Sequence, residues 1–345
     1  MLRQFTGSLL FTIAALFATL AYGWFLTGSV GATAGLIWVV IVLAVLEISL
    51  SFDNAVVNAA VLSEMDDIWQ RRFLTWGMLF AVFGMRILFP LVIVALAAGL
   101  GPIDALKLSL TEPARYEQIV SSAHIAISGF GGAFLALVGM TYFVNPEKTV
   151  HWIGWLERHL VAIATIRAAE IALLLVAMSV IARFLPAHEA LEFIEAGIGG
   201  IVAFVLVEGI GTVLEAREEA RRAAGLAMKS GLGGFIYLNV LDASFSFDGV
   251  IGAFALSNNM VIIAIGLSVG AMFVRSITLL LVRQGTLNEY RYLEHGAFWA
   301  IVALGTIMLL SPRVEVPETV TGLIGAALIG VSLWSSLRAN RREAA

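Results

Sequence analysis

Carboxylates inside apolar segments are the side chains of this sequence most able to do chemistry. One acidic phrase, EISLSFDNAVVNA, occupies residues 47–59, and a second, DASFSFDGVIGAF, occupies residues 242–254. Each lies in an apolar run, where an ionised side chain costs about 2.5–3.5 kcal/mol at the centre of a membrane helix. Retention of acids at that cost favours an ion-binding site over a duplicated scaffold.

The two phrases match without gaps at their polar positions. The matched pairs are Glu47 with Asp242, Ser49 with Ser244, Ser51 with Ser246, Phe52 with Phe247, and Asp53 with Asp248. The following segments share a second pattern, because Gly77 precedes Arg86 by nine residues and Gly266 precedes Arg275 by nine. Two matches in the same order indicate an internal repeat.

The repeated side chains offer only oxygen ligands: carboxylates, hydroxyls and the amide of Asn54. Such ligands suit Mg²⁺, Ca²⁺ and Mn²⁺, whereas the chain has no cysteine thiolate for Cu(I) or Zn²⁺. If the four carboxylates and two arginines share one cavity, their formal charge is −2, which one divalent cation would neutralise. We expect the arginines to pair with the acids when no metal is bound; the alternative is a permanent structural ion pair.

The elements that carry these residues are predicted to be membrane helices. The 345-residue chain is 60% hydrophobic and 13% charged, with a mean hydropathy of +0.93. Its net charge of −4 argues against a nucleic-acid partner. A spanning helix needs about 20 mostly apolar residues. The stretches that qualify are 8–28, 34–62, 73–99, 118–144, 168–186, 190–213, 232–256, 259–282, 293–312 and 318–338.

These ten stretches predict an all-α, polytopic transmembrane bundle. The first could be a signal peptide, but its apolar run exceeds the usual core of about 7–15 residues, so we expect a retained helix. With the N-terminus inside, fifteen basic residues fall on the cytoplasmic side and four on the other. The positive-inside rule therefore predicts cytoplasmic termini in a bacterial-type inner membrane.

Five helices in each half would insert the halves with opposite orientation. We expect a first repeat over residues 1–188, with its core at 34–144, and a second over 189–345, with its core at 232–312. Inverted repeats of this kind are typical of secondary transporters, whose site lies near the bilayer midplane where the halves meet.

Polar residues recur at every second position of both phrases, which places successive members on opposite faces of a regular helix. Either the helix is locally unwound or it presents two polar faces to two neighbours. A competing helical set, Glu47, Ser51, Asn54 and Asn58, has i, i+4, i+7, i+11 spacing. Gly249 and Gly252 favour unwinding in the second half, and we expect discontinuous helices in both halves.

Three further residues are candidates for proton relay. Glu208 lies well inside a predicted span, while His124 and His295 begin two others. A histidine at a helix end is more often an interface residue with its hydrogen bonds satisfied. The connector TVHWIGWLERHL, residues 149–160, is interpreted as solvated or interfacial.

The pair EISLSFDNAVV and DASFSFDGVIG resembles the TerC family of integral membrane proteins, within the LysE transporter superfamily. The specific motifs cover residues 40–100 and 235–285, and Gly249 departs from the pattern where the first half has Asn54. The resemblance implies efflux or homeostasis of divalent metal, with manganese the best-supported substrate of related members. It implies these metal ligands and supporting residues: Glu47, Asp53, Asn54, Asp242 and Asp248, with Ser51, Ser246, Arg86 and Arg275.

The leading hypothesis is therefore a non-enzymatic secondary transporter of Mn²⁺, with Ca²⁺ or Mg²⁺ as alternatives. A second hypothesis is a non-transporting membrane scaffold in a metal or tellurite stress response, with residues 214–230 as its docking arm. A third is an intramembrane metalloenzyme, which is disfavoured because the sequence has no HExxH motif.

Overall fold

A computed structural model describes residues 2–77, 79–145, 148, 150–163, 168–223, 231–254, 256–314 and 316–343. Within these ranges every regular element is a helix and no strand occurs. The all-α class predicted from hydropathy is therefore confirmed.

The helices differ widely in length. In chain order they are α1 (Leu2–Thr27), α2 (Val30–Leu50), α3 (Phe52–Glu64), α4 (Asp67–Arg72), the π-helices η1 (Phe73–Gly77) and η2 (Phe80–Leu88), α5 (Phe89–Ala98), α6 (Pro102–Thr111), α7 (Pro113–Ser122), α8 (His124–Val144), α9 (Gly154–Ile163), α10 (Ala169–Ala182), α11 (Ala187–Ala223), α12 (Leu232–Ala253), α13 (Met260–Gln284), α14 (Thr286–Glu289), α15 (Leu293–Leu310) and α16 (Glu318–Glu343).

In the described part, seven helices are long and apolar enough to cross a membrane, which supports an integral membrane protein. They are α1, α2, α8, α11, α13, α15 and α16. Phe83–Ala95, Ala169–Ala182 and Leu232–Phe245 are three further apolar segments within the described helices. Each of the ten predicted stretches contains helix, but ten separate spans are not confirmed.

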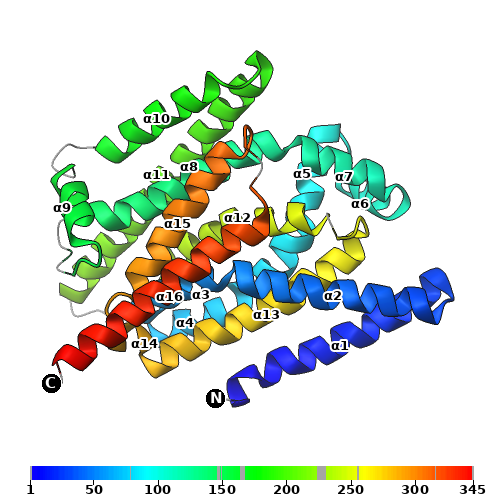
Figure 1. The fold of residues 1–345 in the computed structure, drawn as a ribbon, viewed down its shortest axis with the longest axis horizontal. Helices are drawn as coiled ribbons and strands as arrows, with labels where there is room; N and C mark the ends of the chain where they lie inside the picture. The colour runs from blue at the N-terminus through cyan, green and yellow to red at the C-terminus, as the bar shows by residue number, and fades with distance from the viewer. Residues whose placement is uncertain are drawn as a thin grey trace.

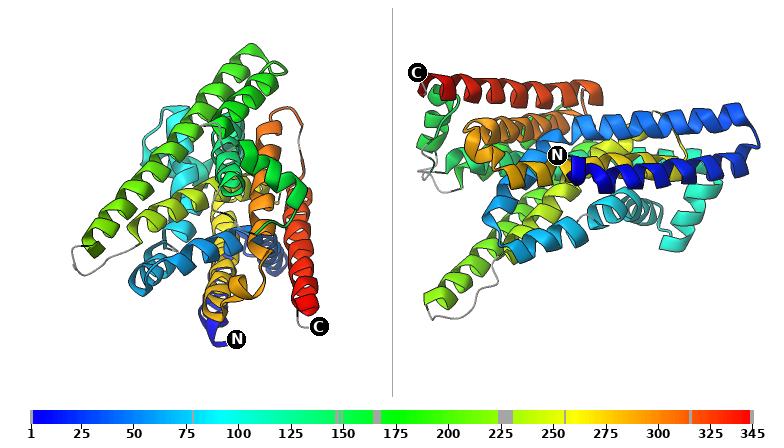
Figure 2. Two further views of the ribbon diagram at one scale, coloured as in Figure 1. Left: turned by 90° about the vertical axis from the view of Figure 1, so that its left-hand side faces the viewer. Right: turned by 90° about the horizontal axis from the view of Figure 1, so that it is seen from below.

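A central group of helices lies between two outer groups (Figure 1). On one side α1 and α2 form a hairpin that packs against α13; on the other, α8, α10 and α11 pack together. α3, α12 and α15 lie between them, and α16 packs along α15 (Figures 1 and 2). Both acidic phrases therefore lie in the middle of the molecule.

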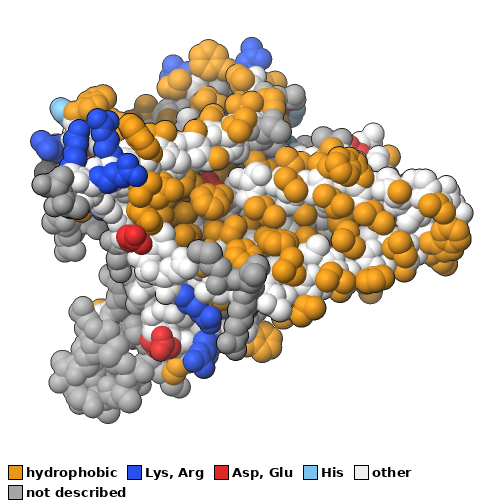
Figure 3. Space-filling model, turned by 60° about the horizontal axis from the view of Figure 1, so that its bottom comes forward, with side chains coloured by type: hydrophobic (Ala, Val, Ile, Leu, Met, Phe, Trp, Pro, Cys, Tyr) orange, Lys and Arg blue, Asp and Glu red, His pale blue; other side chains and the backbone are white. Residues whose placement is uncertain are grey.

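The outer helices expose large apolar side chains. Phe17 and Phe25 of α1 are 68% and 88% exposed, and Leu323 of α16 is 70% exposed. Figure 3 shows apolar side chains across the α1–α2 hairpin. Apolar outer faces at this scale are what helices in contact with lipid require.

Glycines set the crossing of α2 and α13. A methyl group added at Gly270 would lie 2.4 Å from Cβ of Glu47, and one at Gly266 would lie 2.6 Å from Cβ of Leu43. This four-residue spacing of small residues lets two helix backbones approach closely. Glu47 is consequently held against the α13 backbone.

The helix with the first phrase is interrupted at one residue. Ser51 has φ −101° and ψ 17° between α2 and α3, yet its N–H still donates to the carbonyl of Glu47 at 3.0 Å. The second phrase lies on α12, which is continuous through Gly249 and Gly252. The prediction of a discontinuous helix in the second half is therefore wrong, because packing outweighs the roughly 1 kcal/mol that a glycine costs a helix.

The third predicted helix, 73–99, contains two π-helical stretches, η1 and η2, with Arg86 in the last turn of η2. π-Helical segments are rare and occur frequently at functional sites. Composition and periodicity gave no signal for this widened turn.

Candidate cation site

An ion pair between Glu47 and Arg86 lies at the centre of the molecule. The two residues are 3% and 6% exposed, and Nη2 of Arg86 donates to Oε1 of Glu47. The hydroxyl of Ser51 donates to the same carboxylate oxygen at 3.0 Å. The expected pairing of an arginine with the acids is thus present, from α2 to η2.

Asp242 of the second phrase lies beside the first phrase. Nδ2 of Asn58 donates to Oδ1 of Asp242 at 2.9 Å, and Asn54 is a second amide partner of this carboxylate. All three residues are at most 8% exposed. Asp242 is also close enough to Arg86 and Glu47 to interact electrostatically with both.

A void of about 20 Å³ adjoins this cluster, which is room for one water molecule. It is lined by Ser51, Asn54, Asn58, Arg86, Asp242, Ala271, Val274, Arg275 and Thr278. Oδ1 of Asn54, Oδ1 of Asn58 and Nε of Arg275 have no hydrogen-bond partner among the described residues. The second predicted arginine therefore adjoins the cluster without an ion pair to it in the described part of the chain.

The two phrases run antiparallel past each other. Asp242 meets Asn58 at one end, and at the other a methyl group on Gly249 would lie 3.1 Å from Oε2 of Glu47. The α12 backbone continues through Ser246 and Asp248, but their side chains lie outside the described residues. The fold therefore brings the two phrases together.

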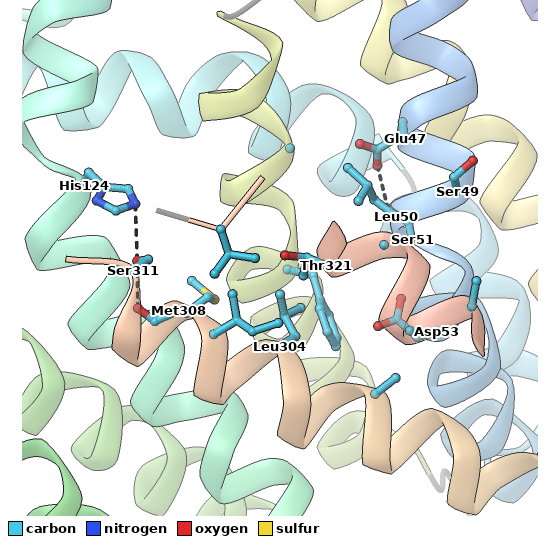
Figure 4. A pocket seen from close by; sticks show the side chains of 18 of the residues that line it. Glu47, Ser49, Leu50, Ser51, Asp53, His124, Leu304, Met308, Ser311 and Thr321 are labelled. Carbon is cyan, nitrogen blue, oxygen red and sulfur yellow. Dashed lines mark hydrogen bonds between the residues drawn. The ribbon is translucent and has the colours of Figure 1, made fainter. Parts of the chain in front are cut away.

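A larger cavity, of about 390 Å³, opens on the other side of Glu47 (Figure 4). Glu47, Ser51 and Asp53 line it from α2 and α3, while His124 and Ser311 lie on its opposite side. Its remaining walls come from α12, α15 and α16. Glu47 and Asp53 thus share one cavity.

Asp53 differs from the other described acids of the phrases. It is 6% exposed, and Oδ1 accepts the backbone N–H of Asn54 at 2.9 Å. Among the described residues no Lys, Arg or His lies within ion-pair distance of it. An uncompensated buried carboxylate is costly, so a cation in this cavity would stabilise it.

Two polar series of the first phrase line different spaces. The residues at every second position, Glu47, Ser49, Ser51 and Asp53, all line the 390 Å³ cavity. The i, i+4, i+7, i+11 set describes the buried cluster, because Ser51, Asn54 and Asn58 line the small void and Ser51 donates to Glu47. The interruption at Ser51 therefore accompanies the gathering of the alternating series on one side, as expected for a discontinuous helix in the first half.

The candidate relay residues lie in three separate places. His124 interacts with Ser128 at 3.3 Å and Ser311 at 3.4 Å beside the 390 Å³ cavity. Glu208 lines a different cavity near the other end of α8. His295 is 3% exposed and interacts with the carbonyl of Val150 at 2.9 Å, away from both acidic phrases.

The connector 149–160, interpreted as solvated or interfacial, contains a glutamate that no spacing in the sequence marked as buried. Glu157 is 0% exposed, so a solvated position is wrong for this residue. Six groups surround its carboxylate: the N–H groups of Trp152 and Ile153 at 3.2 and 3.1 Å, Nε1 of Trp299 at 3.4 Å, and Lys148, His151 and His295 at 3.6, 3.4 and 3.7 Å.

These groups shift the titration of the cluster. Burial alone would raise the pKa of Glu157, but the backbone N–H of Ile153 and the charges of Lys148 and His295 outweigh it and lower the pKa. Burial lowers the pKa of Lys148 to about 8. Nζ of Lys148 also lies 3.8 Å from the ring centroid of Tyr142. No spacing in the sequence predicted that these side chains would come together around Glu157.

Within the described part of the chain, no three acidic or histidine side chains are arranged to hold a metal ion together. Of the ligands implied by the resemblance, Glu47 and Asp53 face the large cavity and Asn54 and Asp242 face the void. The fifth, Asp248, is not described at the level of its side chain.

Residues 52–343 match the family described as "Protein of unknown function (DUF475)". The match spans most of the chain, which belongs to this family. No curated protein and no solved structure matches the chain.

Proposed function

We propose that the chain is a secondary transporter of a hard divalent cation, with Mn²⁺ the foremost substrate and Ca²⁺ or Mg²⁺ the alternatives. The observation that carries the proposal is Asp53, a buried carboxylate without a basic partner among the described residues, in the same cavity as Glu47. Oxygen ligands of this kind suit hard cations. The likeness of the two phrases to the TerC family supports manganese.

Arg86 competes with the transported cation for the carboxylate of Glu47. It neutralises Glu47 in this structure, so a cation entering the cavity has to displace its guanidinium from that carboxylate. The displaced Arg86 has a second acidic partner nearby in Asp242. Exchange of Arg86 between the two phrases would keep the buried charge balanced while the cation is bound.

The crossing of the phrases supports two inverted repeats, residues 1–188 and 189–345. Two helices related by inversion run in opposite directions, and α12 passes the first phrase antiparallel. The distribution of basic residues supports a bacterial-type inner membrane with both termini cytoplasmic.

Mn²⁺ flux into proteoliposomes with a trapped metal indicator tests the proposal. Asp53→Asn keeps the size of the side chain and removes its charge, so we expect it to abolish saturable Mn²⁺ flux. Asp104→Asn is the matched control, because Asp104 is exposed and pairs with the exposed Lys107 at 3.7 Å. Unchanged flux through folded Asp53→Asn protein would refute a substrate site at Asp53.

A further inference from the structure

A second polar cavity, of about 480 Å³, lies on the opposite side of the buried charges. It is lined by Val61 and Met65 at the end of α3 and by Tyr237 near the start of α12. Met65 is seven residues beyond Asn58, which corresponds to about 10 Å along a helix. The Asp242–Asn58 pair therefore lies between this cavity and the cavity of Asp53.

Helix α8 relates the two cavities independently. Its first residue, His124, lines the Asp53 cavity, whereas Thr141 in its last turn lines the second one. Seventeen residues separate them, which corresponds to about 25 Å along the helix. Since α8 is long and apolar enough to span a membrane, a bilayer crossed by α8 would place the two cavities in opposite halves.

The second cavity has polar walls. Besides Glu208, its polar lining residues include Thr141, Thr212, Tyr237 and Asn145. Oγ1 of Thr141 is buried and has no hydrogen-bond partner among the described residues. Such walls suit water and a hydrated cation better than a lipid chain.

Glu208 lies at the mouth of this cavity. Its side chain is exposed and close enough to Tyr237 to interact electrostatically. In the described ranges no basic side chain lies within ion-pair distance of it. A carboxylate within a membrane helix is a functional candidate by default, because it is costly there.

Close helix packing forms one wall of the cavity. A methyl group on Gly233 of α12 would lie 3.1 Å from Cα of Gly211 on α11. The two backbones therefore approach closely at this crossing, and Phe204 and Tyr237 line the cavity beside it.

We propose that this cavity is a second cation-binding vestibule, open to the side of the membrane opposite the Asp53 cavity, with Glu208 as its cation-binding carboxylate. The inference rests on the proposed function and names the second aqueous end of the same path. The occupant is the transported hard divalent cation, and the Glu47–Arg86 and Asp242–Asn58 pairs form the barrier between the two cavities.

The chain has no cysteine, so single cysteines report accessibility without prior engineering. Thr212→Cys and Thr321→Cys place a thiol in the second and the first cavity, respectively. In vesicles of known orientation, we expect a membrane-impermeant thiol reagent to label Thr212→Cys from the cytoplasmic side and Thr321→Cys from the other side. The control Val202→Cys, half-exposed within the apolar span of α11 and outside the cavity lining, should stay unlabelled.

Mn²⁺ protection then tests Glu208 itself. We expect Mn²⁺ to slow labelling of Thr212→Cys at least about tenfold, and Glu208→Gln to remove this protection. Glu195→Gln, an exposed residue of the same helix that does not line the cavity, should retain it.

Two results would overturn the inference: labelling of both cysteines from the same side, or protection unaffected by Glu208→Gln. Either result with Mn²⁺ flux intact leaves the proposed function standing. If the unmodified protein shows no Mn²⁺ flux, the proposed function is refuted instead, whichever sides the two cysteines face.

Discussion

Glu47 and Glu157 are both almost completely buried, at 3% and 0% exposure, yet their surroundings are of different kinds. Glu47 has one arginine and one hydroxyl as partners, and it borders a cavity of about 390 Å³. Glu157 has six donors or cationic neighbours around its carboxylate and borders none of the cavities described above.

The difference separates a carboxylate that borders free space from one that holds chain segments together. A carboxylate whose oxygens are all engaged holds chain segments together, and for Glu157 these are the connector before α9 and helix α15. A carboxylate with few partners and an adjoining cavity can exchange one ligand for another. Burial alone, therefore, does not identify a functional acid; the unused coordination and the space beside it do.

The largest expected effect is that of Glu157→Ala, which removes the carboxylate that holds chain segments together. The substitution removes the carboxylate that pairs with Lys148, His151 and His295. Because the charge of Lys148 is then buried without this partner, we expect a loss of about 3–5 kcal/mol of unfolding free energy. Denaturant unfolding of detergent-solubilised protein measures it. Glu189→Ala is the control, because Glu189 pairs with His188, whose side chain is 82% exposed, and a surface pair of this kind is worth about 0–1 kcal/mol. Equal losses of unfolding free energy in the two variants would contradict a stabilising role of Glu157.

Glu47→Gln should have a smaller effect on stability and a larger one on binding. Glutamine still accepts hydrogen bonds from Arg86 and Ser51, so we expect a loss of about 1–3 kcal/mol. Calorimetric titration should show that saturable Mn²⁺ binding disappears. Undiminished Mn²⁺ affinity in this variant would remove Glu47 from the substrate site and weaken the comparison.

Acid pH should loosen the Glu157 cluster specifically. Because the folded-state pKa of Glu157 lies below its ordinary value of 4.5, its contribution to stability is present above that value and is lost as the pH falls through the folded pKa. We expect the unfolding free energy to fall more steeply with acidification in the parent protein than in Glu157→Gln. Parallel acid profiles would show that the cluster does not titrate on unfolding.

Trp299→Phe should have the smallest effect. It removes the long hydrogen bond of 3.4 Å from the indole to Glu157 and keeps an aromatic ring stacked on Phe143. We expect a loss of about 0.5–1.5 kcal/mol, seen as a small shift of the denaturation midpoint. A loss as large as that of Glu157→Ala would mean that the indole, rather than the charges, holds the cluster together.

Much of the fold could be predicted from local patterns. Apolar length predicted helices in all ten stretches, because hydropathy over 20 residues is a local property. The helical set of Glu47, Ser51, Asn54 and Asn58 followed from spacing alone. The predicted break of α12 at Gly249 is wrong, because packing rather than helix propensity decides whether this helix continues.

The sequence by itself determined which residues are costly in a membrane: four acids and two arginines written in a repeated order within apolar runs. It could not show that Arg86 pairs with Glu47, that Asp53 has no basic partner among the described residues, or that His295 and Trp299 of α15 reach Glu157. Those facts depend on which helix faces approach one another. The crossing of α2 with α13 and of α3 with α12 fixes them through close packing between residues far apart in the chain.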